Sequence, residues 1–224
     1  MHDKYMFLDL DDTIYDYKAA HNPAQTELVA YLSRQLKVNI RAVSVGLHSS
    51  RLKVKQRLGA SASSHSRLIY ISEYLREVDC QAHVELTLSA ESLYWNTFLK
   101  NVLAFDGVHN FLLSSREAGF TNVLVTDLTA SIQRRKLRLL DIDTLFEIVL
   151  TSEEAGGDKV SGAPEKFLEN FLGNIEGICI GDSESDHLFK NKTIFYKKSG
   201  RNRIGNSKVG GEFKSFPRLQ QELF

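Results

Sequence analysis

Short apolar runs alternate with segments of helical periodicity in the first 16 residues and again after residue 101. Helices with one apolar face are predicted at 106–119, 129–140 and 163–173. The lengths and the β-branched or aromatic content of the apolar runs are typical of strands buried on both faces. These runs are YMFL before Asp9, NVLV before Thr126, FEIVL before Thr151, GICI before Gly181, and TIFY at 193–196. The alternation predicts an α/β fold with a Rossmann-like parallel sheet.

The stretch from 17 to 101 has a different pattern, with helical periodicity and no strong strand signal. Apolar stripes predict helices at 22–36, 67–78 and 84–99. Asn22 is expected to be the N-cap of the first of these helices, with Pro23 at its first position. We therefore predict a helical domain at 17–101, inserted into a sheet domain formed by 1–16 and 102–224.

Composition narrows the class of protein. The 224 residues include 28 basic and 28 acidic side chains, so the formal net charge is zero and no bulk field recruits nucleic acid or a membrane. Two cysteines are too few for a disulfide framework. The chain has neither a signal-peptide pattern nor an apolar stretch long enough to span a bilayer, which favours a cytoplasmic protein. The Gly-rich basic segment 197–214 is expected to be a solvated loop.

Polar residues follow four of the predicted strands. Asp9 and Asp11 follow the first strand, and Asp182 and Asp186 follow the fourth. The carboxyl ends of parallel strands meet at one edge of the sheet, where ligand sites form. Carboxylates gathered there repel one another unless some are protonated or a cation neutralises them. Oxygen ligands without His or Cys favour Mg²⁺, so the sequence predicts a magnesium site.

The stretch DLDDT at 9–13 has the DxDxT form of the haloacid dehalogenase superfamily. The other elements follow in that family's order: Thr126 at the end of a strand, Lys159, and IGDSESD at 180–186. The chain therefore resembles this superfamily over its whole length. The helical insert lies where phosphatases of the family carry a C1-type helical cap.

The resemblance implies a catalytic role for four residues. Asp9 would attack phosphorus and form an aspartyl-phosphate. Asp11 would protonate the leaving oxygen and then deprotonate the hydrolytic water. The Thr126 hydroxyl would hold a phosphoryl oxygen, and Lys159 would neutralise negative charge on the phosphate and the nucleophile.

The resemblance also implies metal and substrate ligands. Mg²⁺ would be bound by the Asp9 carboxylate, the Asp11 backbone carbonyl and Asp182, with Asp186 supporting the metal shell. Leu10 and Asp127 would adjoin the phosphate. A charged helix face is the simpler interpretation of the basic residues in the insert. A more specific hypothesis is that two of these residues select the leaving group of the substrate. These two residues are His65 and Arg67.

Other polar residues near these motifs have simpler expected roles. Asp12 is expected to be a turn residue, and Thr13 to hydrogen-bond the loop backbone. Lys136 is expected on a solvated helix face, and His187 is expected to be a surface neighbour of the site. Val160 stands where many relatives have Pro, and Asp127 would place a negative charge near the phosphate unless it points away.

The leading function is a Mg²⁺-dependent phosphomonoester hydrolase acting on a small phosphorylated metabolite. A phosphosugar mutase of the same fold and a catalytically idle binding protein stay open as alternatives. A dehalogenase is disfavoured because those relatives lack the second Asp, which is Asp11 here. A receiver domain is disfavoured because it has no acidic pair such as the one in GDSESD. The identity of the substrate and the oligomeric state stay open.

Overall fold

The computed structural model describes residues 4–79, 83–173, 175–199 and 210–224. The chain divides into two compact units. Met1–Asp16 and Leu103–Phe224 form the sheet unit, and Tyr17–Val102 form the helical unit. The function of the helical unit as a cap stays a prediction.

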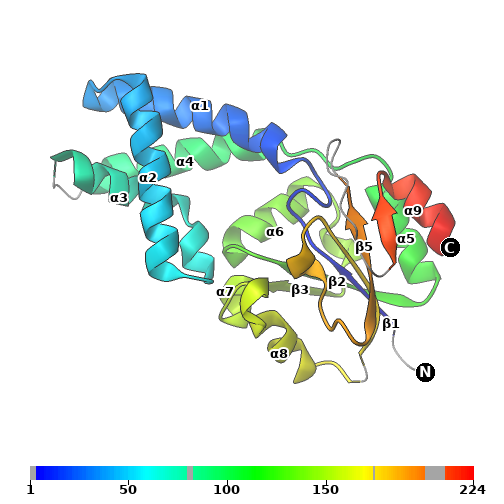
Figure 1. Cartoon of the computed structure of the whole chain (residues 1–224). Helices are drawn as coiled ribbons and strands as arrows, with labels where there is room; N and C mark the ends of the chain where they lie inside the picture. Colours follow the sequence, from blue (N-terminus) through cyan, green and yellow to red (C-terminus); the bar gives the residue numbers. More distant parts are fainter. Residues whose placement is uncertain (1–3, 80–82, 174, 200–209) are drawn as a thin grey trace. The chain divides into compact units, whose positions relative to one another are not determined.

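The sheet unit is built on six strands that pair in the order β3-β2-β1-β4-β5-β6, and every neighbouring pair is parallel (Figure 1). The strands are β1 Lys4–Leu8, β2 Phe120–Thr126, β3 Ile148–Thr151, β4 Glu176–Gly181, β5 Thr193–Lys198 and β6 Gly211–Phe213. The parallel α/β fold is confirmed, and four of the five predicted apolar runs lie wholly in strands, whereas Phe146 and Glu147 of FEIVL precede β3. The sixth strand, β6, was not predicted.

Helices connect the strands of the sheet unit. They are α5 Val108–Glu117, α6 Ala130–Leu139, α7 Ser152–Ala155, α8 Ala163–Glu169 and α9 Phe216–Leu223. Three single 3₁₀ turns lie in the loops, namely η2 Asp143–Leu145, η3 Lys159–Ser161 and η4 Glu184–Asp186. The first turn of α8 contains Pro164, whose fixed φ suits a helix start.

Helices cover both faces of the sheet. Val123 and Val125 of β2 belong to a buried apolar cluster with Leu168 of α8. Asn122 of β2 instead bonds to α5, because its Nδ2 donates to the Leu112 carbonyl at 3.0 Å and its Oδ1 accepts from Ser115 at 2.8 Å. Successive side chains of a strand point to opposite faces, so α5 and α8 lie on opposite sides of the sheet.

The register of the strands aligns the sequence positions that carry polar side chains. Leu8, at the end of β1, lies beside Leu124 of β2 and Ile180 of β4. The Asp9 amide continues this pairing by donating to the Ile180 carbonyl at 3.0 Å. The residues that follow β1, β2 and β4 therefore leave the sheet at one edge.

The described residues of the helical unit form four α-helices. They are α1 Tyr17–Leu36, α2 Ile40–Leu58, α3 Arg67–Asp79 and α4 Val84–Lys100, with a 3₁₀ turn η1 at Ala62–His65. Helix α1 packs on α4, and α2 packs on α3. The prediction of Asn22 as an N-cap is wrong, because α1 begins at Tyr17 and contains Pro23 in its interior. A single packed face that includes the buried Ala20, Ala24 and Leu28 continues past the proline and offsets its cost.

Residues near both ends of the basic segment 197–214 lie in strands. The prediction of a solvated loop at 197–214 is wrong for Lys197 and Lys198, which lie in β5, and for Gly211–Phe213, which form β6. Residues 200–209 lie outside the described residues. Lys198 is buried, and its ammonium nitrogen lies 3.8 Å from the centre of the Phe105 ring, a cation–π contact.

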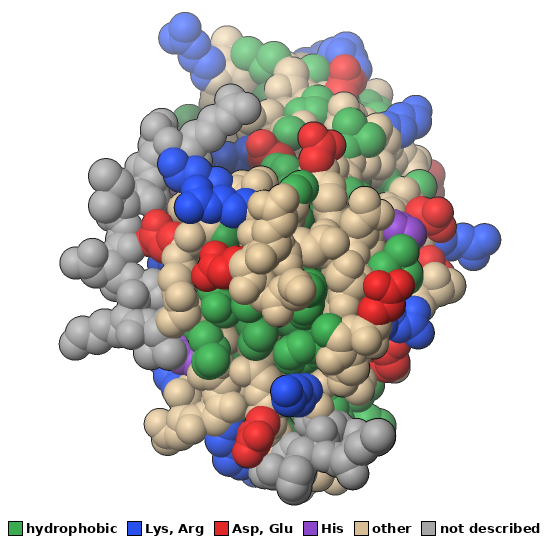
Figure 2. Space-filling view, turned by 90° about the vertical axis from the view of Figure 1, so that its right-hand side faces the viewer, with side chains coloured by type: hydrophobic (Ala, Val, Ile, Leu, Met, Phe, Trp, Pro, Cys, Tyr) green, Lys and Arg blue, Asp and Glu red, His purple; other side chains and the backbone are tan. Residues whose placement is uncertain are grey.

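Charged side chains of both signs are present on one face of the molecule (Figure 2). On the face drawn in Figure 2, basic and acidic side chains of the described residues are interspersed, with a group of hydrophobic side chains between them. Among the described residues, every helix is too short or too polar to cross a membrane.

Candidate active site

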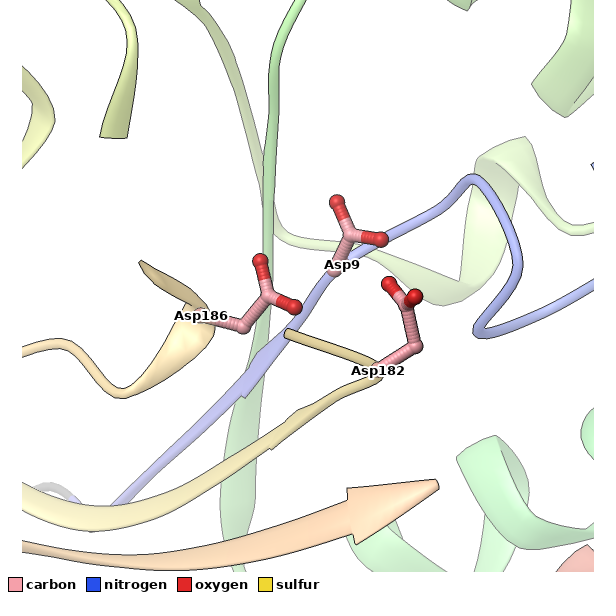
Figure 3. A group of neighbouring side chains, drawn as sticks. All are labelled: Asp9, Asp182 and Asp186. Carbon is pink, nitrogen blue, oxygen red and sulfur yellow. The ribbon is translucent and has the colours of Figure 1, made fainter. Parts of the chain in front are cut away.

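Three carboxylates converge at the carboxyl edge of the sheet. Asp9 follows β1, Asp182 follows β4, and Asp186 lies in the turn η4. Each offers an oxygen within 4.8 Å of the oxygens of the other two. Figure 3 shows the three side chains pointing toward one another from their separate segments.

Local structure fixes Asp186 in this group. Its Oδ2 accepts a hydrogen bond from the Ser183 amide at 2.8 Å, which completes a capping box at the start of η4. The carboxylate is thereby turned back toward the end of β4, and its Oδ1 is left for the site.

Lys159 provides the cation at the centre of the group. Its Nζ lies 2.5 Å from Asp9 Oδ1 and 2.5 Å from Asp186 Oδ1, and the side chain is buried. The Lys159 amide donates to Asp127 Oδ1 at 3.0 Å. The carboxylate of Asp127 therefore turns toward the Lys159 backbone, where it positions this lysine.

The pKa values of the site reflect burial and crowding. Burial raises the pKa of Asp9 well above its usual range; Lys159 opposes this shift, while Asp186 and Asp11 add to it. Burial also raises the pKa of Asp182, to about 6, with contributions from Asp186 and Asp12. Burial lowers the pKa of Lys159, but the nearby carboxylates outweigh burial and hold this pKa above its usual range. Ionised carboxylates are thus unfavourable here without more positive charge.

Two threonines contact the site. Thr13 Oγ1 donates to Asp9 Oδ2 at 3.2 Å, so the expectation that Thr13 bonds the loop backbone is wrong. Its hydroxyl reaches the carboxylate because it lies one turn after Asp9 in a tight loop. The Thr126 hydroxyl is buried and accepts a hydrogen bond from Gln133 Nε2 at 2.6 Å. Gln133 was not singled out in the sequence.

Asp11 lies beside the three-carboxylate group and has its own partners. Lys136 Nζ lies 2.8 Å from Asp11 Oδ1 and 3.0 Å from Oδ2, and the Tyr15 hydroxyl donates to Oδ1 at 2.5 Å. The prediction of Lys136 on a solvated helix face is wrong, because its side chain is fully buried. It shares the buried face of α6 with Ile132 and Leu137. Its i+4 spacing from Ile132 was the signal that could have identified it.

The structure also shows the burial, backbone conformation or contacts of the remaining residues of the sheet unit that were singled out in the sequence. Leu10 is fully buried, and its contact with a substrate stays a prediction. Asp12 has φ +63°, which suits a turn residue. His187 stacks on Phe195, with ring centres 5.2 Å apart. Val160 is exposed, with 72% of its surface accessible, so it does not shape the buried group.

The two predicted leaving-group residues lie in the helical unit. His65 is half-buried in η1. Arg67 donates to the Tyr17 hydroxyl at 2.5 Å, and its guanidinium lies 5.2 and 5.0 Å from the ring centres of Tyr70 and Tyr94. These contacts are all within the unit, and a role of His65 and Arg67 in substrate binding stays a prediction.

The chemistry of the group fits a magnesium ion. The carboxylates of Asp9, Asp182 and Asp186 provide the hard oxygen ligands that Mg²⁺ prefers. Opposite ligands of an octahedral Mg²⁺ lie ~4.2 Å apart, so the 4.8 Å limit of the group requires only small side-chain movements. With Asp11, Lys136 and Lys159 included, four carboxylates and two ammonium groups leave a formal charge of −2, which a divalent cation would neutralise.

Comparison with known proteins identifies the family of the chain. The chain matches the family model for haloacid dehalogenase-like hydrolases over residues 6–189. It therefore belongs to this family, and the prediction made from its four motifs is confirmed.

Two curated relatives and one solved structure are similar to the chain. Ribulose-1,5-bisphosphate 5-phosphatase of Halopiger xanaduensis is 27% identical over 158 residues, 69% of this chain and 65% of that protein, so the chain spans just under two thirds of its length. Glyceraldehyde 3-phosphate phosphatase of Pyrococcus abyssi is 25% identical over 202 residues, 87% of this chain and 81% of that protein. A crystal structure of a HAD phosphatase from Thermococcus onnurineus has a TM-score of 0.74 at 18% identity, covering 98% of this chain and 97% of that chain.

Proposed function

We propose that the protein is a Mg²⁺-dependent phosphomonoester hydrolase that acts on a small phosphorylated metabolite through an aspartyl-phosphate. The observation that carries this proposal is the Asp9 carboxylate, which is buried among one ammonium group and two further carboxylates. The phosphatase activities named for the two curated relatives support it.

Asp9 is the nucleophile in this proposal. One of its carboxylate oxygens forms a bond to phosphorus while the bond from phosphorus to the leaving oxygen breaks. Burial strips water from Asp9, and Lys159 keeps a positive charge 2.5 Å from its Oδ1. The Thr126 hydroxyl and the Lys159 ammonium stabilise the phosphoryl oxygens, on which negative charge accumulates in the transition state.

Asp11 carries the protons. In the first step it gives a proton to the leaving oxygen, and in the second it takes a proton from the water that attacks the aspartyl-phosphate. The second attack breaks the bond between phosphorus and the Asp9 oxygen, which releases inorganic phosphate and restores the Asp9 carboxylate. One residue serves both steps because the first proton transfer leaves it in the basic form that the second requires.

The metal would be held by the Asp9 carboxylate, the Asp11 carbonyl and Asp182, with Asp186 in support. When bound, Mg²⁺ supplies positive charge that lowers the repulsion between the phosphate and the carboxylates. Asp186 and Lys159 would keep the site formed around it through their contact at 2.5 Å.

The substrate class proposed is a small sugar or organic phosphate. The two curated relatives are named for phosphorylated sugars, and we assign the choice of leaving group to His65 and Arg67 in the helical unit. A negative charge of Asp127 beside the phosphate would favour the alternative of a catalytically idle binding protein. The hydrogen bond between Asp127 and the Lys159 amide gives Asp127 a positioning role and weakens that alternative.

A panel of phosphorylated metabolites, assayed for phosphate release with and without Mg²⁺, tests the proposal. We expect turnover of at least one small phosphate ester with Mg²⁺, and none with Asp9→Asn. Isomerisation of a sugar phosphate without phosphate release would identify a mutase. Full metal binding with no turnover of any ester would identify a binding protein.

A further inference from the structure

The ion pair between Lys136 and Asp11 is costly and is not explained by packing alone. The ammonium of Lys136 is fully buried, and the Asp11 side chain is 29% exposed. A buried ion pair is often no more stabilising than apolar side chains of the same volume, because both charges lose water. The nitrogen approaches both Asp11 oxygens, at 2.8 and 3.0 Å, so the pair fixes the plane of this carboxylate.

Tyr15 completes the arrangement around Asp11. Its buried hydroxyl donates to Asp11 Oδ1 at 2.5 Å, and its ring centre lies 5.6 Å from Lys136 Nζ. Among these contacts, Oδ1 receives two hydrogen bonds and Oδ2 receives one. A carboxylate oxygen has two lone-pair positions, so Oδ2 is the oxygen with the greater remaining capacity to hold or accept a proton.

The same helix face reaches a second group of the site. Gln133 and Lys136 are three residues apart on α6 and both are buried. Gln133 donates to Thr126 while Lys136 holds Asp11, so one face of α6 contacts two of the four proposed catalytic residues. A displacement of α6 would therefore move both residues.

We propose that Lys136 and Tyr15 are positioning residues for proton transfer, which hold the Asp11 carboxylate so that Oδ2 faces the leaving oxygen of the substrate. The proposal rests on the proposed phosphatase function, in which Asp11 gives its proton to that oxygen. It assigns no direct contact with substrate to either Lys136 or Tyr15.

The test compares two esters that need proton transfer to different extents. Glycerol phosphate has a poor leaving group that must be protonated, whereas p-nitrophenyl phosphate has a good one. The value of kcat/KM, which reports formation of the aspartyl-phosphate, is measured for Lys136→Met, Lys136→Arg and Tyr15→Phe. Arg135→Met is the matched control, because it removes a cation from an exposed position of the same helix.

Lys136→Met and Tyr15→Phe should lower kcat/KM for glycerol phosphate by about tenfold to a hundredfold, because loss of positioning removes only a fraction of the about 10²–10⁴-fold that acid–base catalysis contributes. The loss for p-nitrophenyl phosphate should be a few-fold at most. Lys136→Arg should recover part of the loss, and Arg135→Met should change neither ester. Equal losses for both esters, or no loss, would overturn the proposal. If Lys136→Met does not fold, the ratio for Tyr15→Phe decides.

A second measurement keeps this inference separate from the proposed function. If the wild-type protein hydrolyses neither ester nor any member of the metabolite panel, the phosphatase proposal fails. Crystal structures of Lys136→Met and Tyr15→Phe then test positioning directly. A rotated Asp11 carboxylate with Asp9 and Lys159 in place would support positioning, and an unmoved Asp11 would refute it.

Discussion

Gly181 and Asp186 lie so close together that a β-carbon on Gly181 would sit 2.1 Å from Asp186 Cβ and 2.3 Å from Asp186 Oδ2. Gly181 is the last residue of β4, and the turn η4 folds Asp186 back over it. The space left by the missing side chain is therefore filled by one of the three clustered carboxylates.

Gly181→Ala should displace Asp186 and weaken the metal site. The contacts are far below van der Waals distance, so η4 must move and the bond from Lys159 to Asp186 must lengthen. We expect Mg²⁺ to raise the melting temperature of this variant much less than that of the wild type. Gly173→Ala is the control, because its β-carbon would have no heavy atom within 4 Å. An unchanged Mg²⁺ response in Gly181→Ala would contradict this account of Asp186.

Lys159→Met should impair both activity and the stability of the metal-free protein. Removing one preorganised electrostatic group from a reaction site lowers kcat by about 10²–10³-fold. Breaking a buried ion pair costs about 3–5 kcal/mol, because the carboxylates of Asp9 and Asp186 lose their counter-charge. Urea denaturation in EDTA measures the stability loss. Added Mg²⁺ should recover part of the stability and little of the activity; recovery of full activity would exclude Lys159 from catalysis.

The pKa of Asp182 predicts a pH dependence of stability. Burial raises this pKa from 3.8 to about 6, so the folded protein keeps a proton that the unfolded chain has lost between these values. The stability that Asp182 contributes is fully present below pH 3.8 and is lost as pH rises through about 6. In EDTA, the stability of the wild type should therefore fall relative to that of Asp182→Asn across this range. A constant difference between the two proteins would show that Asp182 has an ordinary pKa.

Mg²⁺ should reverse this trend. An ionised carboxylate binds the metal and a protonated one does not, so Mg²⁺ should stabilise the wild type more at pH 7 than at pH 5. Thermal melts at both pH values, with and without Mg²⁺, measure the effect. The Asp182→Asn variant should respond weakly to Mg²⁺ at both.

Gln133→Glu should weaken phosphate binding through Thr126. Gln133 donates to Thr126 Oγ1 at 2.6 Å, and the Thr126 hydroxyl itself donates to the Asp127 carbonyl at a long 3.4 Å. An anion bound beside Thr126 would compete only with that weak bond for the hydroxyl hydrogen. A glutamate carboxylate would accept that hydrogen instead. A hydrogen bond to a charged group contributes about 1.5–3 kcal/mol, so KM should rise by about tenfold to a hundredfold. Gln133→Met removes the donor and adds no acceptor, so its KM should rise less than that of Gln133→Glu. A larger rise in KM for Gln133→Met would show that the packing of residue 133, and not its hydrogen bonding, controls phosphate binding.

The helical unit offers a test of leaving-group selection. His65→Ala should raise KM for the best metabolite of the panel and leave p-nitrophenyl phosphate unaffected. Arg67→Met should lower the melting temperature, because the Arg67 guanidinium packs on the rings of Tyr70 and Tyr94. His65 is therefore the cleaner probe of substrate contact. Equal effects of His65→Ala on both esters would assign His65 a structural role.

Strands and clustered carboxylates were predictable because each depends on a local signal. The five predicted strands are apolar runs that end at polar residues, and parallel pairing then brings the residues that follow them to one edge. Strand β6 was missed because its three residues, Gly211–Phe213, are too few and too polar to form such a run. Helix α1 was predicted to start too late because Pro23 is typical of a first turn, and tertiary packing overrode that preference.

Interactions between distant residues could not be predicted from local pattern. Lys136 pairs with Asp11 across 125 positions of sequence, so its spacing from Ile132 could place it on the buried face of α6 but could not identify its partner. The Lys159 amide donates a hydrogen bond to Asp127, which lies 32 positions away in the sequence. Because of this bond, Asp127 positions the lysine and does not simply add negative charge beside the phosphate. Both contacts depend on how α6 and the loop after β3 approach the sheet, which is decided by the folded core.

The position of β1 has a consequence for synthesis on the ribosome. This strand is made before both of its neighbours in the sheet, β2 and β4, which begin at Phe120 and Glu176. Helices α1 to α4 pack on one another within Tyr17–Val102, so this unit can form before the neighbours of β1 have been made. Premature termination anywhere before β4 would leave an apolar segment with an open edge, a target for chaperones and for aggregation.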